Sequence, residues 1–158
     1  MKDIDILYDI VKDEIVYQSP ELYSFIELNR LWVNQFTLYL QSEKYSFYPN
    51  SHYFQDGELN PGYYEEVFSG SDIFLIKHLK RREFKSGENN LFQYVYDRKF
   101  LVIKDDIVYD VSSKNSFLKV YRSHKKDIRT FIRKNNLSFQ EMSRNEIILL
   151  MDYCESFS

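Results

Sequence analysis

The feature that most limits what this chain can fold into is a series of strand-like segments joined by very short polar connections between residues 4 and 111. These segments are rich in β-branched and aromatic residues, as in IDILYDIV, EIVYQ, FTLYLQ and DIFLIKHLKRREF. Two parallel neighbours need a crossover connection of about a dozen residues or more. Because most connections here are shorter, we predict an antiparallel β-meander of about seven to nine strands, either open or curled into a half-barrel.

Two of the expected turns have almost the same sequence. IVKDEIVY spans residues 10–17, and VIKDDIVY spans residues 102–109. The likeness covers only these eight positions, and the flanking sequences do not match. We therefore interpret Lys12-Asp13 and Asp105-Asp106 as the turns of two separate hairpins rather than as the mark of an internal duplication, since polar pairs between strands recur for reasons of turn chemistry.

After Val111 the spacing of apolar residues changes from that of strands to that of helices. Ser112 or Ser113 is a candidate cap for a first helix with an apolar cluster at residues 117, 118 and 121. Ser123 is predicted to cap a second helix, which ends at residues 135–136, two asparagines that tolerate a left-handed conformation. The residues that this second helix should bury are Ile128, Phe131 and Ile132.

The last helix has the clearest pattern in the chain. Ser143 and Glu146 form a capping box, and Met142 and Ile147 occupy the two positions of a hydrophobic staple. The apolar face that follows consists of Ile147, Leu150, Met151 and Cys154.

These patterns predict one α+β domain over residues 1–158. Residues 1–111 form the meander, and residues 112–158 form two or three helices that pack on it. The composition agrees, because the chain has no alanine, only four glycines, 14 Tyr and 13 Phe. Such a balance favours sheet and supplies large aromatic surfaces for a core or a binding face.

Residues that could carry chemistry show no catalytic pattern. The three histidines at positions 52, 78 and 124 lack metal-ligand spacing, and the lone Cys154 excludes both an internal disulfide and a cysteine metal cluster. Glu65 and Glu66 are adjacent, so in a strand they point to opposite faces and should not share an acid-base site. We therefore expect no catalytic residue, no metal and no cofactor, although a hydrolase whose catalytic group assembles from distant positions stays open.

Charge divides the chain into two halves. Residues 1–76 carry a net charge of −9 and residues 77–138 a net charge of +9. Lys125, Arg129 and Arg133 recur at intervals of four residues and should form one basic row on a helix. This row could bind an anionic partner, or it could be a solvated face that the acidic half balances; the net charge of −3 does not favour nucleic acid.

A second candidate binding surface is the aromatic stretch YSFYPNSHYF at residues 45–54. Rings in a polar loop could stack on sugars or grip a peptide, or they could simply fold the loop onto the edge of the sheet. The candidate residues are Tyr45, Phe47, Tyr48, Tyr53 and Phe54.

Five segments together resemble a family of uncharacterised exported proteins of Bacteroidetes-type bacteria, in which a β-meander precedes a lysine-rich helical tail. The segments are LYDIVKDEIVY (7–17), GYYEEVFSG (62–70), FLIKHLKR (74–81), SSKNSFLKVY (112–121) and KKDIRTFIRKNNLSF (125–139). The resemblance implies export, and hence a periplasmic or secreted location if a signal peptide has been cropped from the start; without one, the location would be cytoplasmic. No catalytic or binding residue is implied.

Three functions follow from these expectations. The leading hypothesis is a non-enzymatic binding or structural domain of the bacterial cell envelope, with another protein or an anionic or glycan surface as partner. The alternative is an intracellular interaction protein that uses its acidic N-terminal half or its basic residues 77–134. A small hydrolase is third. The sequence has no apolar run long enough to span a membrane.

Overall fold

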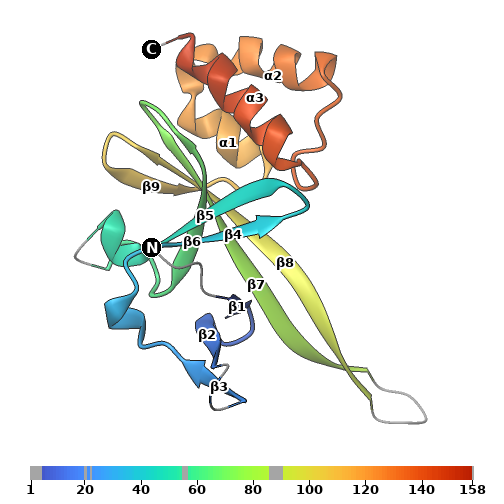
Figure 1. Cartoon of the computed structure of the whole chain (residues 1–158). Helices are drawn as coiled ribbons and strands as arrows, with labels where there is room; N and C mark the ends of the chain where they lie inside the picture. The colour runs from blue at the N-terminus through green and yellow to red at the C-terminus, as the bar shows by residue number, and fades with distance from the viewer. Residues whose placement is uncertain (1–4, 20, 22, 55–56, 86–90, 158) are drawn as a thin grey trace.

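The structure is a computed structural model that describes residues 5–19, 21, 23–54, 57–85 and 91–157. Within these residues an antiparallel meander of nine strands precedes three α-helices, which confirms the predicted α+β fold (Figure 1). The strands are β1 (Ile6–Asp9), β2 (Glu14–Ser19), β3 (Ser24–Glu27), β4 (Phe36–Leu40), β5 (Glu43–Pro49), β6 (Tyr63–Ser69), β7 (Ile73–Lys85), β8 (Leu91–Lys104) and β9 (Ile107–Asp110). The α-helices are α1 (Lys114–Val120), α2 (Lys125–Lys134) and α3 (Arg144–Glu155), and three 3-10 turns are η1 (Arg30–Trp32), η2 (Asn50–His52) and η3 (Arg122–His124).

The strands form two sheets rather than one. One sheet has the order β1-β2-β3 and the other the order β4-β5-β6-β7-β8-β9, so each strand pairs with its neighbour in sequence. The break falls between β3 and β4, where Asn29 accepts a hydrogen bond from the backbone N–H of Leu31 and caps η1. The sequence did not indicate this division, because the strand-like pattern runs on through residues 31–40.

Both predicted hairpin turns are confirmed, but they differ in length. The first turn spans residues 10–13 between the paired Asp9 and Glu14, and Asp13 has a φ of 59°. The second has only two residues, Asp105 and Asp106, with φ angles of 51° and 59°. Two successive left-handed residues are typical of a type I′ turn. The repeated sequence therefore serves two separate hairpins of different construction.

The three helices cover one end of one face of the six-stranded sheet (Figure 1). Alternation along β6, β7 and β8 points every second side chain to that face. These side chains, which include Val67, Phe74, Ile76, Phe100 and Val102, form one core with the buried residues of the helices. Farther along the same face, beyond the helices, β6 and β7 place Glu65 and His78.

The helix ends follow the predicted caps with one exception. Ser113 caps α1, and Ser143 and Glu146 form the capping box of α3. Asn136 ends the second helix with a φ of 52°. The predicted cap at Ser123 is wrong: η3 runs directly into α2, so the cap position falls on His124, whose side chain makes no capping hydrogen bond. No helix in the described part of the chain is both long enough and apolar enough to cross a membrane.

Strands β7 and β8 continue beyond the body of the sheet as a two-stranded ribbon (Figure 1). Their pairing runs without interruption from Ile73 and Ile103 to Lys85 and Leu91. The neighbouring β6 pairs with β7 only as far as Ile76, and β9 pairs only with residues 101–104 of β8. Among the described residues, neither edge of the outer ribbon pairs with another strand.

Candidate functional site

A concave pocket of about 480 Å³ lies where β1, β4, β5 and the base of the ribbon meet. Its size falls within the range of about 300–1,000 Å³ of small-molecule sites. Most of its wall is aliphatic or aromatic, and the described lining has no carboxylate, ammonium or guanidinium group. The lining side chains are those of Ile6, Leu7, Tyr8, Ile10, Leu38, Leu40, Tyr45, Phe47, His78 and Tyr96.

Strand alternation explains why these side chains meet. Leu38 on β4 pairs with Tyr45 on β5, and Phe36 pairs with Phe47 two residues away, so all four share one face. The rings of Phe36 and Phe47 stack with centroids 4.7 Å apart, and Tyr8 of β1 packs 5.3 Å from Phe47. The aromatic packing joins the smaller sheet to the larger one.

A chain of hydrogen bonds lies at the polar end of the pocket. The Nε2 atom of His78 lies 2.7 Å from Glu65 Oε2, and its Nδ1 atom lies 2.6 Å from the hydroxyl of Tyr96. Glu65 is 1% exposed and forms an ion pair with Arg144, so as a carboxylate it accepts the proton of Nε2. In the tautomer with the proton on Nε2, Nδ1 is the acceptor of the Tyr96 hydroxyl proton.

Arg144, the first residue of α3, adds an ion pair to this chain. Its Nε atom lies 2.6 Å from Glu65 Oε1, and its Nη1 atom donates to the carbonyl of Lys44 at 2.7 Å. The guanidinium also lies 4.5 Å from the ring centroid of Tyr45. A cation at a helix N-terminus is unfavourable for the helix dipole, and the buried carboxylate offsets that cost. Arg144 therefore fixes the start of α3 against β5 and β6.

The surroundings of Tyr96 keep its hydroxyl protonated. Burial raises the pKa of Tyr96, and the negative charge of Glu65 raises it further, while Arg98 acts in the opposite direction. A phenol with a raised pKa stays protonated at neutral pH and is a poor nucleophile. The Tyr96 hydroxyl is therefore suited to positioning, with one lone pair left to accept a hydrogen bond from a ligand.

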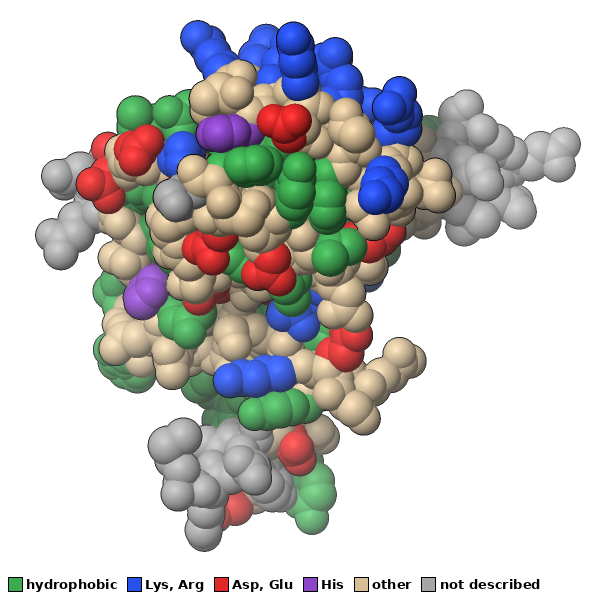
Figure 2. All heavy atoms as spheres, turned by 90° about the horizontal axis from the view of Figure 1, so that it is seen from above, with side chains coloured by type: hydrophobic (Ala, Val, Ile, Leu, Met, Phe, Trp, Pro, Cys, Tyr) green, Lys and Arg blue, Asp and Glu red, His purple; other side chains and the backbone are tan. Residues whose placement is uncertain are grey.

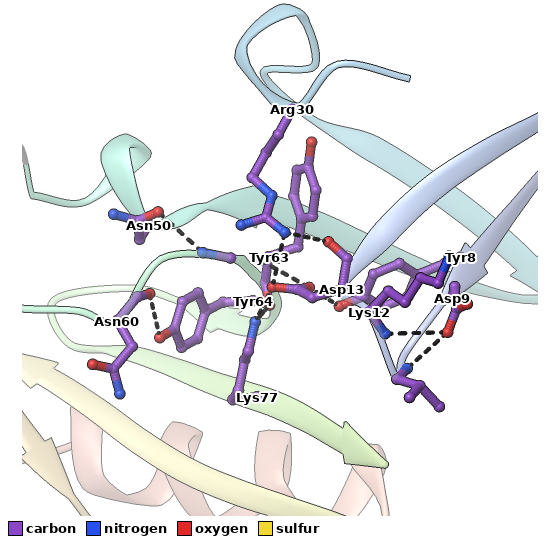
Figure 3. A network of polar contacts seen from close by, with 12 residues as sticks. Tyr8, Asp9, Lys12, Asp13, Arg30, Asn50, Asn60, Tyr63, Tyr64 and Lys77 are labelled. Carbon is purple, nitrogen blue, oxygen red and sulfur yellow. Dashed lines mark hydrogen bonds and ion pairs between the residues drawn. The ribbon is translucent and has the colours of Figure 1, made fainter. Parts of the chain in front are cut away.

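A second polar network secures the β1 wall of the pocket (Figure 3). The carboxylate of Asp13 accepts hydrogen bonds from Lys77 Nζ at 2.7 Å and from the Tyr8 hydroxyl at 2.5 Å. Arg30 donates to the Asp13 carbonyl at 2.8 Å, and Lys77 also donates to the carbonyl of Tyr63. Burial lowers the pKa of Lys77, which Asp13 partly offsets. These contacts connect both sheets, so we assign them a structural role.

Gly62 makes room for that network. Its φ of 135° is one that side-chain-bearing residues rarely adopt, and a Cβ atom there would collide with Asp13 Oδ2 and Lys77 Nζ. The loop before β6 can therefore approach the ion pair only with glycine at this position.

The five aromatic residues predicted as a binding surface are divided between two faces. Residues 43–49 form strand β5, so neighbouring side chains point in opposite directions, and the loop begins only after it. Tyr45 and Phe47 line the pocket. Tyr48 contacts the ring of Tyr53 on the other face, where Tyr53 and Phe54 pack against a separate apolar cluster. The structure brings two of the five to one site.

The predicted basic row lies on α2, away from the pocket lining. Lys125, Arg129 and Arg133 are exposed, while Ile128 and Ile132 on the same helix are buried. Among the described residues, none forms an ion pair with this row. Figure 2, which looks down on the helical end, shows Lys and Arg side chains gathered along one edge. A binding role for the row stays a prediction.

Glu65, His78, Tyr96 and Arg144 were not predicted as a site. Adjacent glutamates do point to opposite faces, as expected: Glu65 meets His78, while Glu66 accepts a hydrogen bond from the Tyr53 hydroxyl at 3.0 Å. Alternation could have placed His78 on the same face as Ile76, but no spacing in the sequence connects it to Arg144.

Comparison with protein-family models, with curated proteins and with solved structures finds no match to this chain. The resemblance to exported bacterial proteins, and the location that it implies, therefore stay predictions. Within the residues that the structure describes, no group of three or more His, Cys, Asp and Glu side chains could hold a metal ion.

Proposed function

We propose that this chain is a non-enzymatic binding domain that accepts an apolar or aromatic group in the pocket between β1, β4, β5 and the ribbon. The observation that carries the proposal is a pocket with apolar walls whose polar groups already have partners in the protein. Tyr8 donates to Asp13 and Tyr45 to Glu43, while Tyr96 and His78 belong to the chain that ends at Glu65. A ligand therefore gains mainly from burial of apolar surface.

The lining also suggests the charge of the ligand. A charged group would lose its hydration without meeting an opposite charge, because the described lining carries none. The free lone pair of the Tyr96 hydroxyl favours one N–H or O–H donor on the ligand. We therefore propose a neutral ligand with an apolar or aromatic body and a single hydrogen-bond donor.

One observation favours hydrolysis as a second candidate function. The order Tyr96, His78, Glu65 places a hydroxyl, an imidazole and a carboxylate in sequence, as in a catalytic triad. The raised pKa of Tyr96 is an argument against it, because a triad must make the hydroxyl easier to deprotonate. We therefore propose that this chain of hydrogen bonds orients Tyr96 for binding.

The cellular setting of the proposal is the bacterial cell envelope, with an intracellular interaction protein as the alternative. The genomic sequence upstream of residue 1 separates these two settings. A secretory leader there would favour the envelope, and its absence would favour the intracellular alternative.

Binding can be tested with N-phenyl-1-naphthylamine, a neutral fluorescent probe with two aromatic groups and one N–H donor. Leu38→Trp should fill the pocket and weaken probe binding about tenfold, which corresponds to about 1.4 kcal/mol. Tyr39→Trp is the matched control, because Tyr39 is the next residue of β4, is 73% exposed and points to the other face. Equal binding by both variants, or no binding by the wild-type protein, would exclude the proposal.

Tyr96→Phe separates binding from hydrolysis. If Tyr96 accepts a hydrogen bond from the ligand and has no catalytic role, the variant should bind the probe about three- to tenfold more weakly. One hydrogen bond contributes about 0.5–1.5 kcal/mol. Hydrolysis of p-nitrophenyl butyrate should be absent from both proteins. A wild-type esterase rate that Tyr96→Phe abolishes would replace the binding proposal with the hydrolase.

A further inference from the structure

One face of the outer ribbon carries a pattern that neither the pocket nor the core explains. Antiparallel pairing places Lys80 opposite Tyr96, Arg82 opposite Tyr94 and Phe84 opposite Phe92. Directly paired side chains share a face, so these residues form one surface beside the pocket. We call its outer part the ribbon face, which consists of Lys80, Arg82, Phe84, Phe92 and Tyr94.

The rings of the ribbon face are open to solvent. Phe84 is 56% exposed, Phe92 is 53% exposed and Tyr94 is 56% exposed. The guanidinium of Arg82 lies 3.6 Å from the ring centroid of Phe92, and Lys80 Nζ lies 5.4 Å from that of Tyr94. A contiguous patch of exposed apolar rings marks a binding site more often than single exposed apolar residues do.

The two faces of the ribbon differ in charge balance. On the opposite face, Arg81 forms an ion pair with Glu83 at 2.8 Å, and Asp97 follows on β8. On the ribbon face, the described residues place no carboxylate within ion-pair distance of Lys80 or Arg82. The ribbon face therefore presents cations that are free to pair with an external anion.

We propose that the ribbon face binds an acidic glycan, a chain of sugars that bears carboxylate or phosphate groups. The rings of Phe84, Phe92 and Tyr94 offer flat apolar surfaces to the C–H faces of sugars. Arg82 can hold a carboxylate or phosphate with two parallel hydrogen bonds, and Lys80 adds a second positive charge. This surface is separate from the pocket, so it goes beyond the proposed function.

Charge density favours a glycan over a nucleic acid. A polynucleotide carries one phosphate at every nucleotide, and its binding depends mostly on the neutralisation of many phosphates. The ribbon face supplies two cations beside three rings, in a chain with a net charge of −3. A glycan in which only some of the sugars are charged matches this ratio of two cations to three aromatic rings better than a polynucleotide does. Arg and aromatic residues are enriched in protein–protein interfaces and Lys is depleted in them, so the experiment below includes an acidic polypeptide as a competing partner.

Isothermal titration calorimetry with hyaluronan, which carries one carboxylate on every second sugar, and with a phosphorylated mannan tests the proposal. We expect both to bind the wild-type protein, and neutral dextran to bind at least tenfold more weakly. Arg82→Gln should weaken binding about tenfold, whereas Arg81→Gln, the same charge change on the opposite face, should stay within twofold. Phe92→Thr should weaken binding, and Val95→Thr on the opposite face should not. Raised salt should reduce the affinity.

Three outcomes would overturn the proposal. The first is absence of binding to both acidic glycans, and the second is an equal effect of Arg81→Gln and Arg82→Gln. The third is tighter binding of the oligonucleotide poly(dT) or of polyglutamate, which would identify a nucleic acid or an acidic protein as the partner. Leu38→Trp, which fills the pocket, should leave glycan binding unchanged, so failure of the pocket proposal and failure of this one can be told apart.

Discussion

Replacing Arg144 with Gln should destabilise the protein by about 4 kcal/mol, because it leaves the buried carboxylate of Glu65 without its cation. The Glu65 side chain is 1% exposed, and the Arg144 side chain is 21% exposed. Loss of one partner of a buried pair costs about 3–5 kcal/mol, and the low end applies because Arg144 reaches water. Loss of the hydrogen bond to Lys44 and of the contact with the Tyr45 ring adds about 1 kcal/mol.

The companion variants make this prediction specific to the charge pair. Glu65→Gln should cost only about 2 kcal/mol, since the partly exposed Arg144 can then turn toward water. The double variant, which carries neither charge, should be at least about 1 kcal/mol more stable than Arg144→Gln alone. Arg129→Gln on the exposed face of α2 is the control and should change stability by less than about 0.5 kcal/mol.

Urea unfolding at neutral pH, followed by far-UV circular dichroism, measures these differences. Fluorescence is a poor probe here because Trp32, the sole tryptophan of the sequence, is 82% exposed. If Arg144→Gln unfolds like Arg129→Gln, the pair does not hold α3 on the sheet. A double variant less stable than Arg144→Gln would show that the destabilisation does not come from a buried, uncompensated charge.

Three further predictions concern single side chains. Ser143→Ala should lower the free energy of unfolding by about 1 kcal/mol in urea unfolding. The backbone N–H of Ser143, which alanine keeps, and the Ser143 hydroxyl, which alanine removes, hold the pKa of Glu146 below its usual 4.5. The part of the difference that comes from the hydroxyl should be complete at neutral pH and shrink as the pH falls well below 4.5; a difference that does not shrink would contradict the hydrogen bond from the Ser143 hydroxyl to Glu146. Asp106→Gly should stabilise the protein by about 0.5–1 kcal/mol in the same assay, because glycine adopts its φ of 59° without strain; a loss would show that the aspartate side chain matters more. Burial raises the pKa of Cys154 to about 12, so native protein at pH 8 should not react with dithiobis(nitrobenzoate), whereas rapid labelling would show that the α3 core opens.

Local rules account for the parts of the fold that the sequence revealed. The turn at Asp105-Asp106, the capping box of Ser143 and the end of α2 at Asn136 each depend on residues within four positions of one another. Short connections also fixed the antiparallel order of the strands. The wrong cap at Ser123 is a limit of such rules. The 3-10 turn η3 shifts the start of α2 by one residue, and the sequence pattern does not distinguish a 3-10 turn from the first turn of an α-helix.

The pocket could not be predicted because its residues meet only through long-range packing. His78 is 13 positions from Glu65, and Arg144 is 79 positions from Glu65. Their contact depends on where α3 begins relative to β6, which no periodicity specifies. Tyr45 and Phe47 were identified as candidates, but they were grouped with Tyr48 in one surface, whereas the alternation of β5 places Tyr48 on the other face.

The central claim, that the pocket between the two sheets is a binding site, is tested most directly by locating the bound probe. With N-phenyl-1-naphthylamine on methyl-labelled protein, we expect nuclear Overhauser effects between the probe and the methyl groups of Ile10 and Leu38 and the ring of Tyr96. The methyl groups of Leu149, 45% exposed on α3, should show none. Contacts to Leu149, or contacts spread over the surface without those three residues, would contradict the account.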